Sequence, residues 1–304
     1  MSKETSSDPP AGQPTVILCG LGSHPVLGGL YDQLVRRGRR RAVFLPLENF
    51  PQDIRFTFHQ VEGEVLGQIG IEGDEPVDFE DLVSVAVDGY FIVSEAEGLS
   101  EEDLEYRNTE SWAALRALFG CLAERCLVVN HLKEREHFDS RLAELSLLNS
   151  HGLPVPKVLV TNSPEDAKRF LQEVGSVVYR TVGGSEVAFR KLESSDLDRL
   201  EELKLAPVHF EAEPTGRLAG VVKVGRQLFL NPRDAQFPVE IIENFTELCD
   251  QQGLHFAELR LCQSSEGAMW QALGITPFLT EQGMSDADAV DAALRVLEFG
   301  EVDV

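Results

Sequence analysis

Several features are missing from this sequence of 304 residues, and each absence excludes a class of protein. No stretch approaches the roughly 20 consecutive apolar residues of a membrane-spanning helix, so no membrane segment is predicted. The five cysteines are odd in number and contain no CxxC pair, which disfavours a disulfide framework or a zinc site. We expect buried apolar thiols instead.

Positive charge is also scarce. The chain carries 27 Lys and Arg against 51 Asp and Glu, which gives a net charge of −24. The field of such a protein repels phosphate backbones and anionic lipids, so neither nucleic acid nor a membrane surface is an expected partner. The basic run 36–41 (RRGRRR) has two interpretations. It binds a phosphate or an acidic partner, or it is a solvated helix end whose cations interact favourably with the helix dipole.

The first residues, 1–14, are polar and include several Ser and Pro. They lack the apolar core of a signal peptide, and we expect a disordered arm. A cytoplasmic location follows as an expectation.

The opening third alternates apolar runs with helical patterns. Residues 15–19 (TVILC) precede the glycine turn 20–22 (GLG), a helical pattern over 26–37 and a strand pattern over 41–47. This order predicts a doubly wound α/β domain. Pro25 occupies the place of the third glycine of a dinucleotide-binding GxGxxG motif, so NAD binding is not predicted.

The remaining elements follow from periodicity and helix caps. In the first domain, which closes near residue 131, we expect a hairpin at 56–61 and 65–71, a strand within 83–93, a helix over 108–125 capped by Asn108 or Thr109, and a strand at 126–130. Beyond it we expect helices at 134–150, from Pro164 (capped by Ser163) to about 174, 194–203, 238–252 and 285–299, strands at 157–161, 254–262 and 268–277, and a hairpin formed by 176–181 and 186–192.

Three segments carry a resemblance to a known family: 141–145 (RLAEL), 152–174 (GLPVPKVLVTNSPEDAKRFLQEV) and 177–180 (VVYR). In their order of turn, strand, cap and helix they resemble the ATP-grasp ligases, in particular the peptide-maturase (graspetide-type) branch and the glutathione-synthetase-like carboxylate–amine ligases. The resemblance implies an α/β protein: a pre-ATP-grasp domain over 15–131, then an ATP-grasp domain of two α+β lobes over 132–304, with the smaller lobe at about 155–206.

The resemblance also implies a nucleotide site, in which lysines hold the phosphates of ATP and a glycine-rich tip covers them. The residues that match its cofactor-binding positions are Arg141 and Arg180 for the lysines, Gly183, Gly184 and Ser185 for the tip, and Glu211 and Glu213 for contacts to adenine or ribose. From the residues alone, the tip is an ordinary turn and the two glutamates are a solvated strand face. The flat guanidinium fork does not suit a pocket for an ammonium group, so ATP is expected to bind weakly.

The metal positions of the family hold no suitable ligands here. Its Asp matches Arg260, its Glu and Asn fall near Leu273 and Ile275, and its γ-phosphate Arg falls on Ala219. Residues 268–279 contain no Asp, Glu or Asn, so a shift of the alignment does not restore the ligands. Hydrocarbon cannot coordinate a hard cation. We therefore predict no metal ligand and no catalytic residue, and leave open that Arg260 itself supplies one positive charge in place of Mg²⁺.

Two functions from different classes remain. One is a catalytically degenerate ATP-grasp protein that acts as a non-catalytic partner, peptide-binding scaffold or regulator, beside an active ATP-grasp paralogue. The alternative is an active ATP-dependent carboxylate–amine or ester-forming peptide ligase with an unusual metal site. A nucleotide sensor without turnover is a third interpretation. In each case the expected partner is a peptide or protein, and a homodimer is the default assembly.

Overall fold

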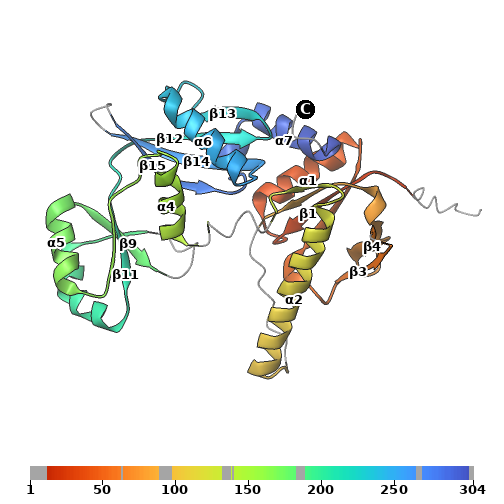
Figure 1. Ribbon diagram of the computed structural model, residues 1–304, viewed down its shortest axis with the longest axis horizontal. Coiled ribbons are helices and arrows are strands. Elements are labelled where there is room, and N and C mark those ends of the chain that lie inside the picture. The colour runs from red at the N-terminus through yellow and green to blue at the C-terminus, as the bar shows by residue number, and fades with distance from the viewer. Residues whose placement is uncertain are drawn as a thin grey trace, which may run out of the picture. The chain divides into compact units, whose positions relative to one another are not determined.

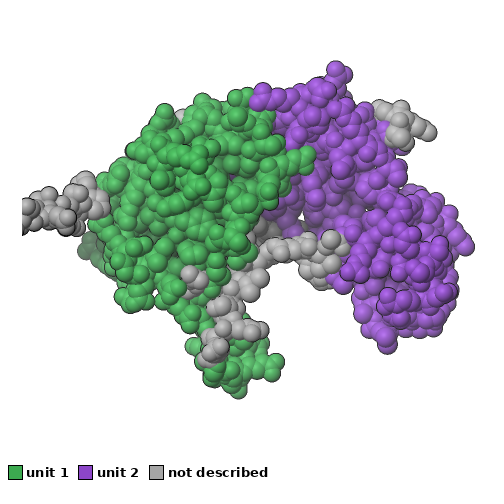
Figure 2. All heavy atoms as spheres, turned by 180° about the vertical axis from the view of Figure 1, so that it is seen from behind, with its two compact units in different colours: residues 1–132, 224–227, 278–304 green, residues 133–223, 228–277 purple. Residues whose placement is uncertain are grey.

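The computed structural model describes residues 12–62, 64–88, 98–131, 138, 140–182, 189–264 and 269–300. The chain forms two compact units, which are coloured separately in Figure 2: residues 1–132, 224–227 and 278–304, and residues 133–223 and 228–277. Within the described residues, no helix combines the length and apolar character needed to cross a bilayer.

The first unit is built on a parallel sheet with the strand order β2-β1-β6-β7. Its strands are β1 (Thr15–Gly20), β2 (Arg41–Pro46), β6 (Leu82–Val87) and β7 (Leu127–Val129). The helices beside it are α1 (Pro25–Arg37), α2 (Glu101–Leu122) and α7 (Ala287–Phe299). This topology confirms the predicted doubly wound α/β domain.

Helices cover both faces of this sheet. Ile17 of β1 and Val85 of β6 share an apolar cluster with Leu115 of α2. Ser84, the neighbour of Val85, points to the opposite face because side chains alternate along a strand, and there its Oγ donates to the carbonyl of Leu297 in α7 at 2.7 Å. Helix α1 contacts α7, β1 and β2.

An antiparallel sheet of three strands adds to the first unit. Its strands are β3 (Ile54–Val61), β4 (Glu64–Ile71) and β5 (Val77–Asp78), and the short 3₁₀ helices η1 (Leu47–Asn49) and η2 (Phe79–Asp81) lie beside them in the chain. The pairing of β3 with β4 confirms the predicted hairpin. Apolar residues of this sheet join the cluster that α2 covers.

The start of α2 differs from the prediction. The helix begins at Glu101, and its cap is Ser100, whose Oγ accepts from the Asp103 amide at 3.1 Å. Asn108 and Thr109 lie inside the helix. The prediction missed the first two turns because they are acidic and mostly exposed, so they carry no apolar periodicity, and Figure 1 shows this end of α2 extending beyond the sheet.

The second unit contains two sheets of four strands, each in its own lobe; the small-lobe sheet is antiparallel, and so is the β14–β15 pair of the other. The small-lobe sheet has the order β10-β9-β11-β8, with β8 (Val158–Thr161), β9 (Val177–Thr181), β10 (Arg190–Lys191) and β11 (Val208–Ala212). The large-lobe sheet has the order β13-β12-β14-β15, with β12 (Gly216–Val224), β13 (Gln227–Asn231), β14 (Phe256–Ser264) and β15 (Trp270–Thr276). The other elements of these lobes are α4 (Arg141–Ser150), α5 (Pro164–Val174), η4 (Ser194–Leu205) and α6 (Val239–Gln251).

Two helices of this unit show where prediction succeeded and where it failed. Helix α5 begins at Pro164, and the Ser163 Oγ accepts from the Asp166 amide at 3.2 Å, which confirms the predicted cap. Helix α4 begins only at Arg141, because Ser140 has an extended backbone at its N-cap. The predicted start at Glu134 lies outside the described residues.

The C-terminal helix shows that compact packing does not follow chain order. Helix α7 contacts β6 and α1, so residues 278–304 belong to the first compact unit. The predicted domain limits, which end the first domain near residue 131, stay a prediction.

The five cysteines are free thiols. Cys19, Cys249 and Cys262 are buried, as expected, while Cys121 and Cys126 are only partly buried. Burial raises the pKa of Cys249 to about 12 and that of Cys126 to about 11, so these thiols stay protonated and unreactive at neutral pH.

The basic run 36–41 attaches α1 to α7. Arg37 and Arg39 lie 3.2 and 3.4 Å from the Glu298 carboxylate, and the Arg40 Nε donates to the Glu298 carbonyl at 2.9 Å. Arg37 also pairs with Asp291. Glu298 is only 1% exposed. At least half of the run therefore has a structural role that neither sequence interpretation included.

We expect Glu298→Gln to lower the free energy of unfolding by about 1–3 kcal/mol, because the arginines would then face a buried neutral amide. Asp291→Asn on the same helix is the matched control, since this carboxylate is half-exposed and its loss should cost less than about 1 kcal/mol. Urea denaturation of both variants measures the difference. Equal effects would contradict the role assigned to Glu298.

Candidate functional site

Three of the predicted site residues lie together in the second unit. Arg141 is the first residue of α4, Arg180 lies on β9, and Glu211 lies on β11. All three are at least 90% buried. With Glu144, His209 and the ring of Phe189 they form what we call the ionic cluster. Gly183, Gly184 and Ser185, predicted to cover the phosphates, lie outside the described residues.

The strongest contact of the ionic cluster is a bidentate ion pair. Arg141 donates from Nε to Glu211 Oε1 at 2.7 Å and from Nη2 to Glu211 Oε2 at 2.9 Å. Fork-to-carboxylate pairs of this geometry are among the strongest hydrogen bonds in proteins. The guanidinium edge that the sequence assigned to phosphate therefore faces a carboxylate of the protein itself.

A second carboxylate joins Arg141 to the large-lobe sheet. Glu144 lies one helical turn after Arg141, and its Oε2 accepts from Arg141 Nη1 at 2.9 Å. The other oxygen, Oε1, accepts from the backbone amide of Ile275 at 2.7 Å. Ile275 lies on the edge strand β15, where Glu144 satisfies a backbone donor that no strand pairs.

His209 and Phe189 complete the ionic cluster. His209 Nε2 lies 2.8 Å from Glu211 Oε1, and because an ionised carboxylate only accepts, Nε2 carries the proton. Arg180 lies directly opposite His209 in the register of the neighbouring strands β9 and β11. The guanidinium carbons of Arg180 and Arg141 lie 5.3 and 5.8 Å from the centre of the Phe189 ring, within cation–π range.

The pKa shifts follow from these contacts. Burial alone would raise the pKa of Glu211, but hydrogen bonds from Arg141 and His209, together with their charge, hold it below its ordinary value. Burial likewise opposes the charge of Arg141, yet the bonds and charges of Glu211 and Glu144 raise its pKa. The pKa of Arg180 is lowered, first by burial and then by the nearby charge of Arg141.

Glu213 is not part of the ionic cluster. It lies just beyond the end of β11, where Lys191 Nζ is 2.8 Å from its carboxylate and the Ser176 hydroxyl donates to it. Its predicted contact with a nucleotide stays a prediction. Glu211, in contrast, is 4% exposed, so the solvated-face interpretation is wrong for this residue.

On the large-lobe sheet, the residues of β15 that face the ionic cluster are one position away from those that the family resemblance selected. In the β14–β15 ladder, Arg260 pairs with Gly274 and Glu258 with Thr276, and a bulge follows Arg260. Ile275 lies in the apolar core on the other face. The residues of β15 next to the site are therefore Gly274 and Thr276, and neither is a carboxylate. Ile275, expected near the Asn position, was misplaced because a bulge reverses the phase of a strand.

On β12, too, the residue that the resemblance selected, Ala219, is not the one that faces the site. Val221 lies in the apolar core, so Ala219, two residues earlier, shares its face. Gly220 points the other way, where an added Cβ would lie 3.9 Å from Glu258 Oε1. No arginine stands at either position. Among the described residues, no group of three or more His, Cys, Asp or Glu is placed to hold a metal ion.

Several members of the ionic cluster were not predicted, although two had a signal in the sequence. The spacing of Arg141 and Glu144 (RLAE) is that of a helical ion pair, and His209 is two residues from Glu211, so a strand places both on one face. Phe189 carried no such signal, and neither did Gly274, which lies beside the cluster. Gly274 has φ of +152°, and an added Cβ would lie 2.8 Å from Glu144 Oε1.

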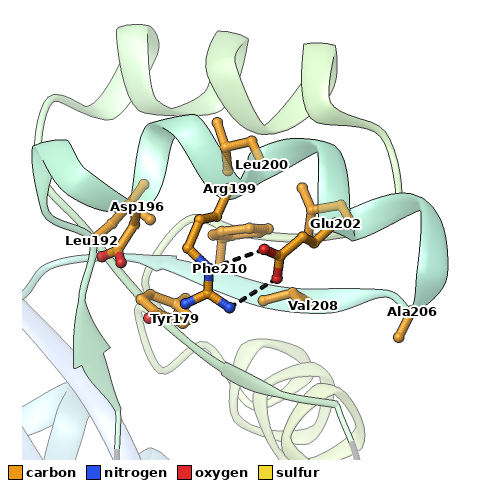
Figure 3. Close-up of a pocket in the computed structure, with 10 residues that line it drawn as sticks. Tyr179, Leu192, Asp196, Arg199, Leu200, Glu202, Ala206, Val208 and Phe210 are labelled. Carbon is orange, nitrogen blue, oxygen red and sulfur yellow. Dashed lines mark hydrogen bonds and ion pairs between the residues drawn. The ribbon is translucent and has the colours of Figure 1, made fainter.

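A separate cavity of about 210 Å³ lies in the small lobe (Figure 3). Tyr179, Val208 and Phe210 line it from the sheet, and Arg199 and Glu202 of η4 pair beside it at 2.8 Å. Tyr179 and Phe210 alternate with Arg180 and Glu211 along their strands, so the cavity is on the opposite face of the sheet from the ionic cluster. Arg199 and Glu202, which line it, are exposed, so the cavity opens to solvent beside the apolar core of the lobe.

Comparison with known proteins establishes the fold. No family profile and no curated protein sequence matches the chain. Among solved structures, the macrocyclase MdnC bound with precursor peptide MdnA from Microcystis aeruginosa MRC is 18% identical, with a TM-score of 0.79 over 93% of this chain and 99% of that one. A RiPP-associated ATP-grasp ligase from Chryseobacterium gregarium, in complex with ADP and a leader and core peptide, is 14% identical, with a TM-score of 0.76 over 93% and 96%.

A third structure is the ATP-grasp ligase PsnB complexed with minimal precursor, Mg and ADP. It is 20% identical, with a TM-score of 0.73 over 93% of this chain and 97% of that one. At these identities the likeness concerns the fold. It confirms the predicted ATP-grasp α/β architecture and the resemblance to peptide-modifying ligases.

We expect Glu211→Gln to lower the free energy of unfolding by about 3 kcal/mol, because the buried Arg141 would lose its bidentate partner. Glu213→Gln is the matched control near the same strand end, and its pair should contribute less than about 1 kcal/mol. Chemical denaturation at neutral pH measures both. A Glu211→Gln protein as stable as the wild type would contradict the importance of the ion pair.

The same variant carries a pH signature. Because the pKa of Glu211 is lower in the folded than in the unfolded chain, its stabilising contribution is complete above the unfolded value of about 4.3 and is lost as the pH falls through the folded value. The stability difference between the wild type and Glu211→Gln should therefore narrow in acid. A difference that widens below pH 4 would reverse the assigned sign.

Proposed function

We propose that this protein is a catalytically degenerate ATP-grasp protein that binds a peptide as a non-catalytic partner, scaffold or regulator. The observation that carries the proposal is the face of β14 and β15 next to the ionic cluster. Arg260, Gly274 and Thr276 stand there, and a guanidinium repels a divalent cation while glycine offers no side-chain ligand. Glu258 is the one carboxylate of this ladder, where by the resemblance a ligase carries an Asp, a Glu and an Asn.

The nucleotide positions support the same proposal. ATP-grasp ligases, by the resemblance noted above, hold the phosphates with lysines, whereas Arg141 is engaged by Glu211 and Glu144 through three hydrogen bonds. A phosphate group would have to compete with two carboxylates already in place. These residues do not fit Mg²⁺–ATP, and we derive no reaction step through it.

A peptide is the proposed partner because the structural neighbours include complexes with precursor peptides. A cytoplasmic setting beside an active ATP-grasp paralogue fits a protein that keeps the fold but not the ligands. The proposed assembly is a homodimer.

The second candidate is an active peptide ligase with an unusual metal site. Its support is that Arg141 and Arg180 keep positive charge at the positions that, by the resemblance, match the phosphate-binding lysines. The two candidates differ in what magnesium does. In a ligase Mg²⁺ bridges the phosphates and strengthens ATP binding. In the degenerate protein no side chains coordinate Mg²⁺, so it should not change the affinity for ATP.

Calorimetric titration with ATP, in Mg²⁺ and in EDTA, tests the proposal. We expect weak binding with a Kd of about a millimolar or above, no strengthening by Mg²⁺, and no ADP release over hours. A catalytically active ATP-grasp ligase run in parallel controls for the conditions. Micromolar, magnesium-dependent binding accompanied by ADP release would establish the ligase instead.

A further inference from the structure

Strand β2 is the edge strand of the parallel sheet in the first unit, where its neighbour in the strand order is β1. In a strand, the N–H and C=O of one residue point to one edge, and those of the next residue point to the other edge. The Arg41 amide donates at 3.1 Å to the carbonyl that precedes β1, so Arg41 and every second residue after it face β1. Ala42, Phe44 and Pro46 therefore present their backbone groups to the outer edge.

The outer edge of β2 offers backbone groups for further pairing. Within the described ranges, neither the Ala42 nor the Phe44 amide donates to another residue. Pro46 has no amide proton, and on an outward-facing position of an edge strand no ladder bond is lost by that. An edge of this kind is a template on which another extended segment can pair.

An open groove of about 790 Å³ lies beside β2, and residues 41–44 and 46 line it. One wall comes from α1, with Gly28 and Tyr31, and the other from the end of β4 and the turn after it, with Ile71 and Asp74. An added Cβ on Gly28 would meet no atom within 4 Å, so the space beside this wall is open. Ligand pockets measure roughly 300–1,000 Å³, and the groove therefore has room for a short extended segment.

The lining of the groove is acidic. It holds the carboxylates of Asp32, Asp74 and Glu75 and one arginine, Arg41. Arg41 lies 3.9 Å from the Glu75 carboxylate and donates to the Glu75 carbonyl at 2.7 Å. The lining residues thus carry two more negative than positive charges, and Asp32 and Asp74 are exposed. Charge complementarity favours a segment that contains lysine or arginine.

A second copy of this chain fits the edge less well than a peptide does. If β2 paired with β2 of another copy, the walls formed by α1 and the end of β4 would meet the same walls of that copy. Both grooves are acidic, so their charges would also repel. A single extended segment brings no walls of its own and can carry the opposite charge.

We infer that the outer edge of β2 binds an extended, basic peptide segment as an additional strand of the sheet. Hydrogen bonds to the backbone of Ala42 and Phe44 and to the Pro46 carbonyl hold the segment, and the acidic lining selects lysine or arginine. The inference rests on the proposed function, because it assigns a surface of the first unit to the proposed peptide partner. The edge binds and aligns the peptide, and no covalent bond is made or broken.

Amide hydrogen exchange of the full chain, measured for each residue by NMR, tests the inference. The probe is the capped pentapeptide Lys-Thr-Val-Thr-Lys, which is basic and favours the extended conformation. A few backbone hydrogen bonds correspond to a Kd of about a millimolar, so about 10 mM peptide should slow exchange of the Ala42 and Phe44 amides about tenfold. The amides of Val43 and Leu45 already face β1 and should not change.

Two further peptides separate the backbone contribution from the charge. The probe N-methylated at its three central residues keeps the side chains but loses the backbone donors, and it should give no protection. The capped peptide Glu-Thr-Val-Thr-Glu reverses the charge and should protect the two amides less. Protection by the N-methylated peptide would overturn strand addition, and stronger protection by the acidic peptide would overturn the basic partner.

Gly28→Leu fills the groove from α1, and Gly29→Leu is the matched control. Gly29 is the next residue of the helix, is exposed and does not line the groove. An added Cβ would meet no atom within 4 Å at either position, and leucine favours a helix over glycine, so both variants should be at least as stable to heat as the wild type. We expect Gly28→Leu to abolish the protection by the probe and Gly29→Leu to preserve it.

Absence of protection by the probe, or equal effects of the two leucine variants, would overturn the inference. So would slow exchange of Ala42 and Phe44 in the free chain, if dilution or deletion of residues 1–11 relieved it, because a second copy or the chain's own N-terminal residues would then occupy the edge. These results leave the proposed function intact, since the peptide would then bind elsewhere. Magnesium-dependent ADP release would overturn the proposed function without changing the exchange at β2.

Discussion

Arg141 is 7% exposed, and a cation so far from water must be neutralised where it lies. Its neutralisation requires Glu211 of the small-lobe sheet, Glu144 on the next turn of α4, and through Glu144 the backbone of Ile275 in the large-lobe sheet. These hydrogen bonds of about 3 Å form only when α4, β11 and β15, which are far apart in the sequence, pack against one another. The start of α4, the phase of β11 and the glycine at 274 all depend on this one ion network, because a shift in any of them would leave a buried charge without its partner.

Most elements of the fold could be predicted from the sequence because local physics determines them. The strand at Thr15–Gly20 and the helix begun by Ser163 and Pro164 are specified by apolar runs, a cap and a proline. The errors are also physical. The first turns of α2 are acidic and exposed, so only tertiary context and the Ser100 cap mark them as helix. The packing of α7 on β6 involves residues more than 200 positions apart, and no local signal reports such a contact.

The candidate site was predictable as a set of positions but not as a set of contacts. The resemblance selected Arg141, Arg180 and Glu211, and the structure places them within one cluster. It gave no indication that two of them bind each other, because charge alone does not reveal a partner 70 residues away. Nor could the phase of β15 be read from alternation, since the bulge after Arg260 moves Ile275 into the core and brings Gly274 to the site.

Replacement of a lysine by arginine preserves charge, but its effect depends on the carboxylates nearby. At Arg141, a phosphate would either displace Glu211, leaving that buried carboxylate without its bidentate partner, or add a further negative charge beside two existing ones. Both routes weaken binding. What opposes phosphate at this position is therefore the pair of carboxylates Glu144 and Glu211, not the guanidinium itself.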